Sequence, residues 1–197
     1  MLLLLAMFIG RLEATALPSA FASAGGAIGL PLPIAFNRPG PIARATLVSA
    51  GSDPKVYGDL TFSRIAGSNA ISIEGLVFNL TPGLHGFHIH TKGKLTNQCK
   101  DAAGHFNPEG VDHAGPASPL RHAGDLGNIV AVAGTAATPV RILDAGFTLG
   151  DGGPRDAFGR AVMVHAGADD LGRGGDAGSR KAGNAGPRVA CGVIRPL

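Results

Sequence analysis

The chain has 197 residues, of which 31 are glycine and 14 are proline, and its formal net charge is +3. This length suits one domain of ordinary size with a short extension, and the composition is rich in turn-forming residues. The small, scattered positive charge gives no indication of nucleic-acid binding. There are two cysteines, Cys99 and Cys191, and an even count behind a secretion signal allows one disulfide.

The first 24 residues have the pattern of a signal peptide. The run from Leu2 to Gly10 is uninterrupted and apolar, too short to span a bilayer but suited to the hydrophobic region of a secretory signal. Small residues at 14–16 and 22–24 provide two candidate cleavage sites. We therefore expect a secreted, extracellular protein without stable membrane insertion after processing. An organelle transit peptide, for example to a plastid, and a buried first strand are the alternatives.

Residues 25–42 are predicted to form a proline-rich linker. Four prolines fall between positions 31 and 41, and proline favours extended chain over a packed core element. The predicted folded domain then occupies residues 43–197.

From residue 43 onward the chain breaks into short apolar runs with alternating side chains. In one run Val56, Leu60 and Phe62 fall on one side, and Tyr57 and Thr61 fall on the other. Turn-forming residues bound most of these runs. The expected strands are Ala43–Ser49, Lys55–Arg64, Ala70–Asn79, Leu84–His90, Leu126–Ala133, Val140–Leu143, Gly159–His165 and Val189–Ile194. About eight such strands predict an all-β fold, a Greek-key β-sandwich or flattened eight-stranded barrel.

Two long segments interrupt this pattern. Residues Thr91 to Asp125 show almost no strand character, and residues Ala166 to Arg188 are rich in glycine. Loops of that length in a compact domain are usually functional. We therefore expect two long functional loops that carry the chemistry.

The histidines are the strongest chemical signal in the sequence. All seven lie at residue 85 or later, mostly in or next to the two long loops. His88 and His90 stand two residues apart at the end of an expected strand, so both imidazoles lie on one face. Together with His165 they form a nitrogen-rich set, which favours copper over harder ions.

A second candidate set lies along the first long loop. Three imidazoles, from His105, His113 and His122, and the Asp125 carboxylate could fill a closed tetrahedral zinc site of the structural kind. Because each imidazole has two nitrogens, the two sets could share a histidine.

Five segments in order resemble motifs of the copper–zinc superoxide dismutase family. They are Gly83–His90, Gly104–Pro108, Arg121–Asn128, Val164–His165 with Ala168–Gly172, and Gly183–Gly192. The resemblance implies an enzyme, an oxidoreductase that dismutates superoxide to dioxygen and hydrogen peroxide in antioxidant defence, with a copper ion and a zinc ion as cofactors.

The resemblance also implies a role for each residue. Copper would be bound by His88, His90, His105 and His165. Zinc would be bound by His105, His113, His122 and Asp125, so that the His105 imidazolate bridges the two ions. The resemblance also implies that Asp169 hydrogen-bonds the outer nitrogens of His88 and His113. Arg188 would attract the superoxide anion, and Cys99 and Cys191 would form a disulfide.

Some residues have no assigned role in this scheme. His85 lies on the opposite strand face from His88 and His90, so we expect packing and a backbone hydrogen bond for it. The cations Lys92, Lys94, Arg180 and Lys181 are either additional attractors of the substrate or ordinary surface charges. Lys92 also stands where the family's cytosolic dimers have an apolar interface residue, which leaves the interface of a homodimer uncertain. The interval from Asp125 to His165 is also a few residues longer than is usual in the family, around Gly150 to Asp156.

Two other functions compete with the enzyme. A copper-delivery protein with a dismutase-like domain usually lacks part of the copper set and carries additional cysteine motifs, whereas this chain has all four copper positions and no C-x-x-C motif. A zinc-stabilised binding module would need the zinc set but not His88, His90, His165 and Arg188 together.

Overall fold

The structure, a computed structural model, describes residues 40–52 and 54–197. The predicted signal peptide (1–24) and most of the predicted linker (25–42) lie outside the described residues. Within the described part, no helix has the length and apolarity needed to span a bilayer.

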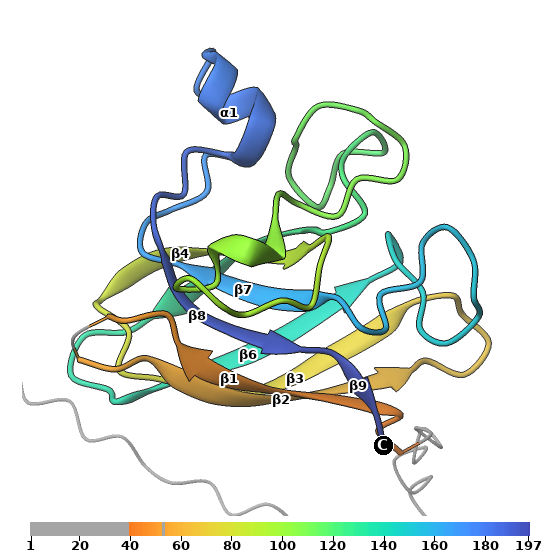
Figure 1. Cartoon of the computed structure of the whole chain (residues 1–197), viewed down its shortest axis with the longest axis horizontal. Helices are drawn as coiled ribbons and strands as arrows, with labels where there is room; N and C mark the ends of the chain where they lie inside the picture. The colour runs from red at the N-terminus through yellow and green to blue at the C-terminus, as the bar shows by residue number, and fades with distance from the viewer. Residues whose placement is uncertain (1–39, 53) are drawn as a thin grey trace, which may run out of the picture. The chain divides into compact units, whose positions relative to one another are not determined.

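Strands dominate the described residues, and helix is confined to two short pieces (Figure 1). The strands are β1 (Ala43–Ser49), β2 (Tyr57–Arg64), β3 (Ile71–Phe78), β4 (Gly83–His90), β5 (Asp125–Ala131), β6 (Ala137–Asp144), β7 (Ala161–His165), β8 (Arg188–Val193) and β9 (Arg195–Pro196). The helical pieces are η1 (Lys100–Ala102) and α1 (Ala177–Ala182). The predicted all-β class is therefore confirmed.

The strands form one nearly closed antiparallel barrel. Their order is β5-β4-β7-β8-β1-β2-β3-β6, with β9 added beside β1, and the end strands β5 and β6 also lie alongside each other. The chain enters the barrel through β1, which pairs with β2 along Ala43–Leu47 and with β8 at Val48 and Ser49. This arrangement confirms the expected Greek-key sandwich or flattened eight-stranded barrel.

Alternating side chains fill the barrel interior as the sequence pattern predicts. Leu60 and Phe62 of β2 are fully buried, whereas Tyr57 of the same strand is half exposed. They pack with buried side chains from the opposite half, such as Phe87 of β4 and Val164 of β7. Each residue of this kind contributes about 1.5–3 kcal/mol of hydrophobic stabilisation.

The strand boundaries differ from the expected ones at a few places. β6 is longer than the predicted Val140–Leu143, because it includes Pro139, which pairs with Leu76 of β3. Proline is tolerated there because β6 is the last strand of the hydrogen-bonded order and needs ladder bonds on one side only. β9 was not predicted, because two residues carry no periodicity.

The two long loops both leave the strands that carry the histidines. Residues 91–124 join β4 to β5, and residues 166–187 join β7 to β8; Figure 1 shows them in green and blue on the same side of the barrel. The backbone N–H of His113 in the first loop donates to the carbonyl oxygen of Arg180 in the second, at 2.7 Å. The loops therefore support each other above one face of the barrel.

Candidate metal centre

Six histidines and one aspartate from separate parts of the chain meet beside β4 and β7. Their potential ligand atoms form two groups, and within each group all these atoms lie within 4.8 Å of one another. We call the first the nitrogen group: His88, His90, His105 and His165. We call the second the mixed group: His105, His113, His122 and Asp125. All seven side chains are buried, and His105 belongs to both groups.

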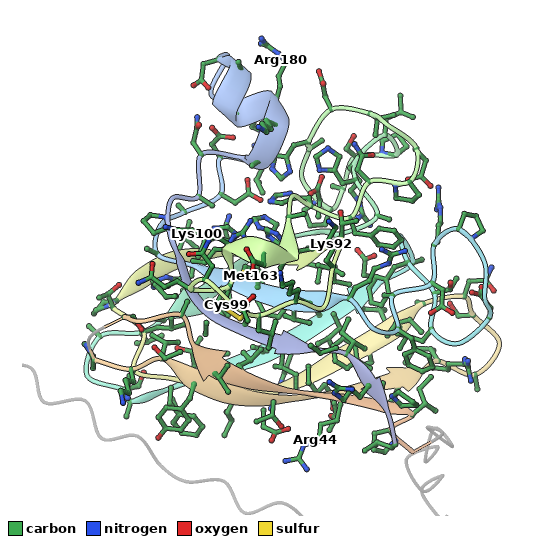
Figure 2. The ribbon with its side chains drawn as sticks, viewed as in Figure 1. Arg44, Lys92, Cys99, Lys100, Met163 and Arg180 are labelled. Carbon is green, nitrogen blue, oxygen red and sulfur yellow. A yellow bond between two sulfur atoms is a disulfide. The ribbon has the colours of Figure 1, made fainter. Side chains whose placement is uncertain are left out.

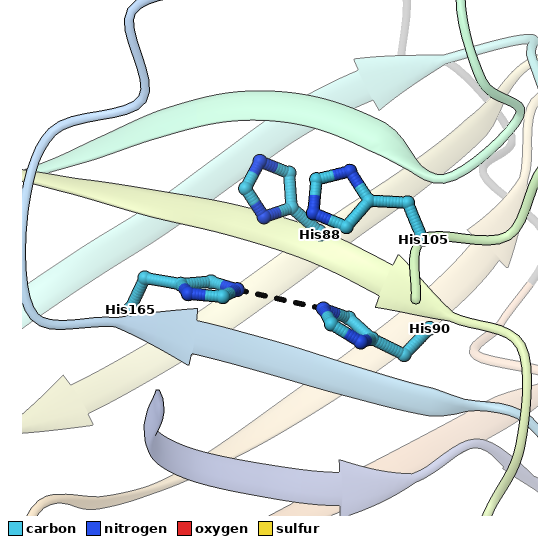
Figure 3. Close-up of side chains that lie close together, drawn as sticks. All are labelled: His88, His90, His105 and His165. Carbon is cyan, nitrogen blue, oxygen red and sulfur yellow. Dashed lines mark hydrogen bonds between the residues drawn. The ribbon is translucent and has the colours of Figure 1, made fainter. Parts of the chain in front are cut away.

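Two rings of the nitrogen group point their unprotonated nitrogens at each other. His90 Nδ1 lies 2.8 Å from the Ala103 carbonyl oxygen, and His165 Nδ1 lies 2.9 Å from that of Gly186. Because a carbonyl oxygen only accepts, each neutral ring carries its proton on Nδ1. The Nε2 atoms that face each other at 3.4 Å therefore both present lone pairs (Figure 3). This arrangement is repulsive unless a cation lies within reach of both.

The other two rings of the nitrogen group each contain a buried nitrogen without a partner. His88 donates from Nε2 to Asp169 Oδ2 at 2.9 Å, which leaves the lone pair on Nδ1. His88 Nδ1 and His105 Nε2 are buried and make no hydrogen bond. Leaving a buried polar atom unpaired costs about 1–3 kcal/mol, so these two lone pairs are suited to binding a cation.

The mixed group converges on one carboxylate oxygen. Asp125 Oδ1 lies 2.9 Å from Nδ1 of His105, 2.9 Å from Nδ1 of His113 and 3.1 Å from Nδ1 of His122. The outer Nε2 atoms of two of these rings face acceptors: that of His113 lies 2.8 Å from Asp169 Oδ1, and that of His122 lies 2.9 Å from the carbonyl oxygen of Val111. The Nδ1 lone pairs of these two rings consequently face a negative oxygen, an arrangement that a cation would make favourable.

His105 differs from the other rings because neither of its nitrogens faces an acceptor outside the two groups. Its Nδ1 faces Asp125 in the mixed group, and its Nε2 is the unpartnered atom of the nitrogen group. The ring therefore lies between the two groups with one nitrogen directed into each.

Asp169 connects the groups from behind. Its two carboxylate oxygens accept from Nε2 of His88 and of His113. Asn128 fixes the backbone of Asp169 by accepting from its N–H at 2.8 Å and donating to its carbonyl oxygen at 2.9 Å. Gly183 has φ +65°, and a Cβ there would lie 1.9 Å from Asp169 Oδ1, so glycine is required. Asn128 and Gly183 both lie inside the motifs that resemble the family, but the resemblance implied no role for either residue.

The protonation states of the nitrogen group and of the two aspartates suit cation binding. Burial, assisted by the neighbouring rings, lowers the pKa of His88 to about 3, and burial lowers that of His165 to about 4. Burial also opposes the charged form of His113, but the carboxylates of Asp125 and Asp169 outweigh it and raise its pKa to about 9, so a metal ion bound there would displace a proton from this ring. Although burial opposes it, hydrogen bonds with the histidines keep the pKa of both aspartates below the usual range. Neutral imidazole and ionised carboxylate are the forms that bind metal ions.

Arg188 and the disulfide lie next to the nitrogen group. Cys99 and Cys191 are bonded, with their Cα atoms 6.3 Å apart, so the predicted disulfide is confirmed. The guanidinium of Arg188, the first residue of β8, donates to the carbonyl oxygens of Cys99 and Ala103. The Ala103 oxygen also accepts from His90, so the guanidinium shares an acceptor with a ring of the nitrogen group.

The remaining candidates of the sequence analysis lie around these groups. His85 is buried outside both, with Nδ1 2.8 Å from the carbonyl oxygen of His165 and Nε2 2.8 Å from that of Thr81. Arg180 and Lys181 line a cavity of about 410 Å³ that reaches His105 and His122. Lys94 pairs with Asp101 at 3.2 Å, and Lys92 is exposed.

Comparison with known proteins identifies one family. The family model described as copper/zinc superoxide dismutase matches residues 56–194. A solved structure described as that of the clock protein EA4 is 39% identical in sequence, with a TM-score of 0.71, and the match covers 80% of this chain and 96% of that chain.

Proposed function

Because the chain belongs to the copper/zinc superoxide dismutase family, we propose that it dismutates superoxide to dioxygen and hydrogen peroxide. In this proposal the nitrogen group holds copper and the mixed group holds zinc, with the imidazolate of His105 shared between them. The observation that carries the proposal is the set of buried nitrogens, on His88, His105 and His113, that have no hydrogen-bond partner.

The donor chemistry fits these two ions. An all-imidazole set suits copper, and a set of three imidazoles and one carboxylate suits a closed zinc site. Copper, when bound, would supply one-electron redox chemistry, which dismutation requires, whereas zinc has no redox chemistry.

The chain's own residues would attract the substrate, supply a proton and orient the metal-binding rings. Arg188 would attract and orient the anion, since its guanidinium is held by two backbone carbonyls beside His90. His105 Nε2 is the atom that would hold and release a proton between the two half-reactions, because no other hydrogen bond occupies it. Asp169 keeps His88 and His113 in the orientation that directs Nδ1 inward.

Metal content and superoxide turnover, measured on the same purified samples, test the assignment of the two groups. We expect His165→Ala to lose copper and activity while it retains zinc. Asp125→Ala should lose zinc and loosen the first loop, with part of the copper chemistry surviving. If both variants lost only zinc, the assignment of the two groups would be wrong.

An Arg188 series tests the role of the guanidinium separately from the metals. Lysine keeps the charge without the planar fork, so Arg188→Lys should keep much of the activity. Arg188→Ala should lose about 10- to 100-fold of it, and Arg188→Glu more, because attraction of the anion is lost and then reversed. Metal content should not change. Activity of the unmodified enzyme should fall as ionic strength rises; equal activity in all variants at low salt would remove Arg188 from the mechanism.

The same measurements separate the enzyme from other functions. The matched structure is described as a clock protein, so turnover must be measured directly. A copper-delivery protein would release its copper to an acceptor without turning over superoxide, and a zinc-stabilised binding module would purify with zinc alone.

We also propose that the protein is secreted. The Cys99–Cys191 disulfide supports this proposal, because disulfides persist mainly in oxidising compartments, and so does the signal-peptide pattern of residues 1–24. Mass spectrometry of the protein recovered from the culture medium of expressing cells would identify the mature N-terminus.

A further inference from the structure

The side chain of Arg160, which comes just before β7, connects three separate parts of the chain. Its Nε donates to the carbonyl oxygen of Asp156 at 2.8 Å, and its Nη1 donates to that of Thr91 at 2.7 Å. Its guanidinium carbon lies 3.7 Å from the centroid of the Phe106 ring, where a cation is attracted to the aromatic face. The proposed function uses none of these three contacts.

Two of the contacts adjoin potential metal ligands. Thr91 follows His90 of the nitrogen group, and Phe106 follows His105, the ring that both groups share. The residue after Thr91, Lys92, is labelled near the end of β4 in Figure 2. The guanidinium therefore contacts the chain one residue beyond each of these two histidines.

Thr91 holds the backbone on one side of His105. Its N–H donates to the carbonyl oxygen of Gly104 at 2.9 Å. Its hydroxyl lies 3.2 Å from the same oxygen and 3.1 Å from the carbonyl oxygen of His105. Because Arg160 holds the Thr91 carbonyl oxygen, the residue that fixes this segment is itself fixed from the far side.

Phe106 holds the backbone on the other side of His105. Its N–H donates to the carbonyl oxygen of Ile89 at 2.8 Å, and its own carbonyl oxygen accepts from Gly124 at 2.9 Å. The Phe106 side chain is buried, and the Arg160 guanidinium lies over its ring. The shared ring is therefore carried between two anchored neighbours, and one side chain contacts both.

His105 depends on this backbone support more than the other rings do. Each of the other five rings faces an acceptor outside the two groups with its outer nitrogen, as His90 does with the carbonyl oxygen of Ala103. Both nitrogens of His105 are directed into the groups. No outer contact of its own orients this ring, so its place is set through the backbone of its neighbours.

We propose that Arg160 is a positioning residue for His105, which it acts on through Thr91 and Phe106. A guanidinium suits this role because it is planar and can stack on a ring while it donates several hydrogen bonds. Without Arg160 the shared ring would move toward one group, and the two ions would cease to share it while each group kept its other donors. The inference rests on the proposed function for the two ions and deepens it.

Magnetic coupling between two bound ions tests the position of the ring without measuring turnover. Cobalt(II) is loaded in place of zinc and copper(II) is added second, and the copper signal is recorded by electron paramagnetic resonance. Paramagnetic ions that share one imidazolate couple through it, so the copper signal is suppressed where the ring is shared and appears where it is not. Copper and cobalt contents are measured on the same samples.

The variants compared are Arg160→Met, Arg160→Lys and Arg155→Met. Methionine keeps an apolar chain over Phe106 but loses the charge and the hydrogen bonds, whereas lysine keeps the charge. Arg155→Met is the matched control, because Arg155 also lies in residues 145–160 and also contacts the first long loop, through Glu109 at 2.6 Å. Both methionine variants change the net charge equally, and neither arginine is a potential metal ligand.

We expect about tenfold more uncoupled copper in Arg160→Met than in the unmodified protein. Arg160→Lys should be intermediate, at about threefold, and Arg155→Met should change the signal less than about twofold, since an exposed ion pair contributes little. Equal signals in the two methionine variants would overturn the proposal. Loss of both ions from Arg160→Met would overturn it as well, because Arg160 would then support the whole loop and not the ring.

The same samples separate this inference from the proposed function. Uncoupled copper in the unmodified protein would overturn the shared His105 ring and the inference together. Coupling that depends on Arg160, in a protein without superoxide turnover, would overturn the proposed function and leave the positioning role standing.

Discussion

The nitrogen group and the mixed group differ in what holds their side chains in place. Three members of the nitrogen group, His88, His90 and His165, stand on barrel strands whose backbone is fixed by ladder hydrogen bonds and a buried core. Of the mixed group, only Asp125 belongs to a strand, and its three histidines lie in the loop of residues 91–124.

This difference separates a site that is built in advance from one that organises its surroundings. Strand donors keep their positions because the barrel holds them. The loop donors depend on Asp125, on Asp169 and on contacts such as the His113 N–H with the Arg180 carbonyl. An ion in the mixed group should therefore stabilise the fold, and an ion in the nitrogen group should mainly supply chemistry.

Removal and stepwise return of the metals should have the largest effect. Structural zinc binding is worth ~10 kcal/mol or more, so metal-free protein should melt at least about 20 °C lower. Zinc alone should restore more than half of this loss, because its donors hold the loop. Differential scanning calorimetry measures these shifts in melting temperature. A full recovery with copper alone would show that the nitrogen group, and not the mixed group, stabilises the fold.

Loss of the disulfide should rank second. The bond joins positions 92 residues apart, so chain entropy predicts about 4–5 kcal/mol of stabilisation. It also ties the first loop to β8, which carries Arg188. Urea unfolding of the metal-loaded Cys99→Ala/Cys191→Ala variant, beside the unmodified protein, gives the difference. An unchanged midpoint would mean that the loop is held without the bond.

Asp169→Asn tests the carboxylate that supports a ring of each group from outside. An amide nitrogen cannot accept a hydrogen bond, so one of the two rings, His88 or His113, would lose its partner. Loss of such an outer contact typically weakens metal binding about 10- to 100-fold. We expect zinc affinity to fall more than copper affinity, because His113 lies in the loop and His88 lies on β4. Competition with a chelator measures both, and equal losses would contradict the proposed difference in support.

A smaller effect is expected in residues 145–160, between β6 and β7, where a carboxylate organises a loop without metal donors. Asp156 accepts from the backbone N–H groups of Gly150, Gly152 and Phe158 at 2.9–3.0 Å. Although burial opposes it, these bonds lower the pKa of Asp156. Asp156→Asn should cost about 1 kcal/mol of unfolding free energy near neutral pH.

The pH dependence of that variant follows from the direction of the pKa shift. A lowered pKa means that the stabilisation by Asp156 is present above the ordinary aspartate pKa and is lost as the pH falls through the folded-state value. The stability difference between the metal-free unmodified protein and metal-free Asp156→Asn should therefore shrink on acidification below about pH 4. A difference that grew on acidification would show that the carboxylate is not the stabilising form.

The barrel could be predicted because its signals are local. Alternation in a strand such as β2 and turn residues at its ends are readable within about ten residues of sequence. The same periodicity separated His85 from His88 and His90, and His85 indeed lies outside both groups. Two features were not predicted. The start of β6 was missed because it contains Pro139, and β9 was missed because it has only two residues.

Much of the site's support could not be predicted, because it depends on backbone atoms that only the fold brings together. Nothing in the sequence indicates that the Ala103 carbonyl serves both His90 and Arg188. Likewise, Asn128 holds the backbone of Asp169 across 41 positions. Side-chain motifs reveal candidate donors, whereas carbonyl acceptors have no residue-specific signature.

The pairing of β1 with β8 has a consequence for synthesis of the protein. Val48, near the start of the domain, pairs with Cys191, near its end, so the barrel cannot close until the ribosome has produced β8. Until then β1 exposes an unpaired edge, and Cys99 has no native partner. Non-local pairing of this kind folds slowly and leaves aggregation-prone intermediates. The growing chain therefore passes through a period in which the barrel and the disulfide have not formed, and protection by a chaperone would matter most then.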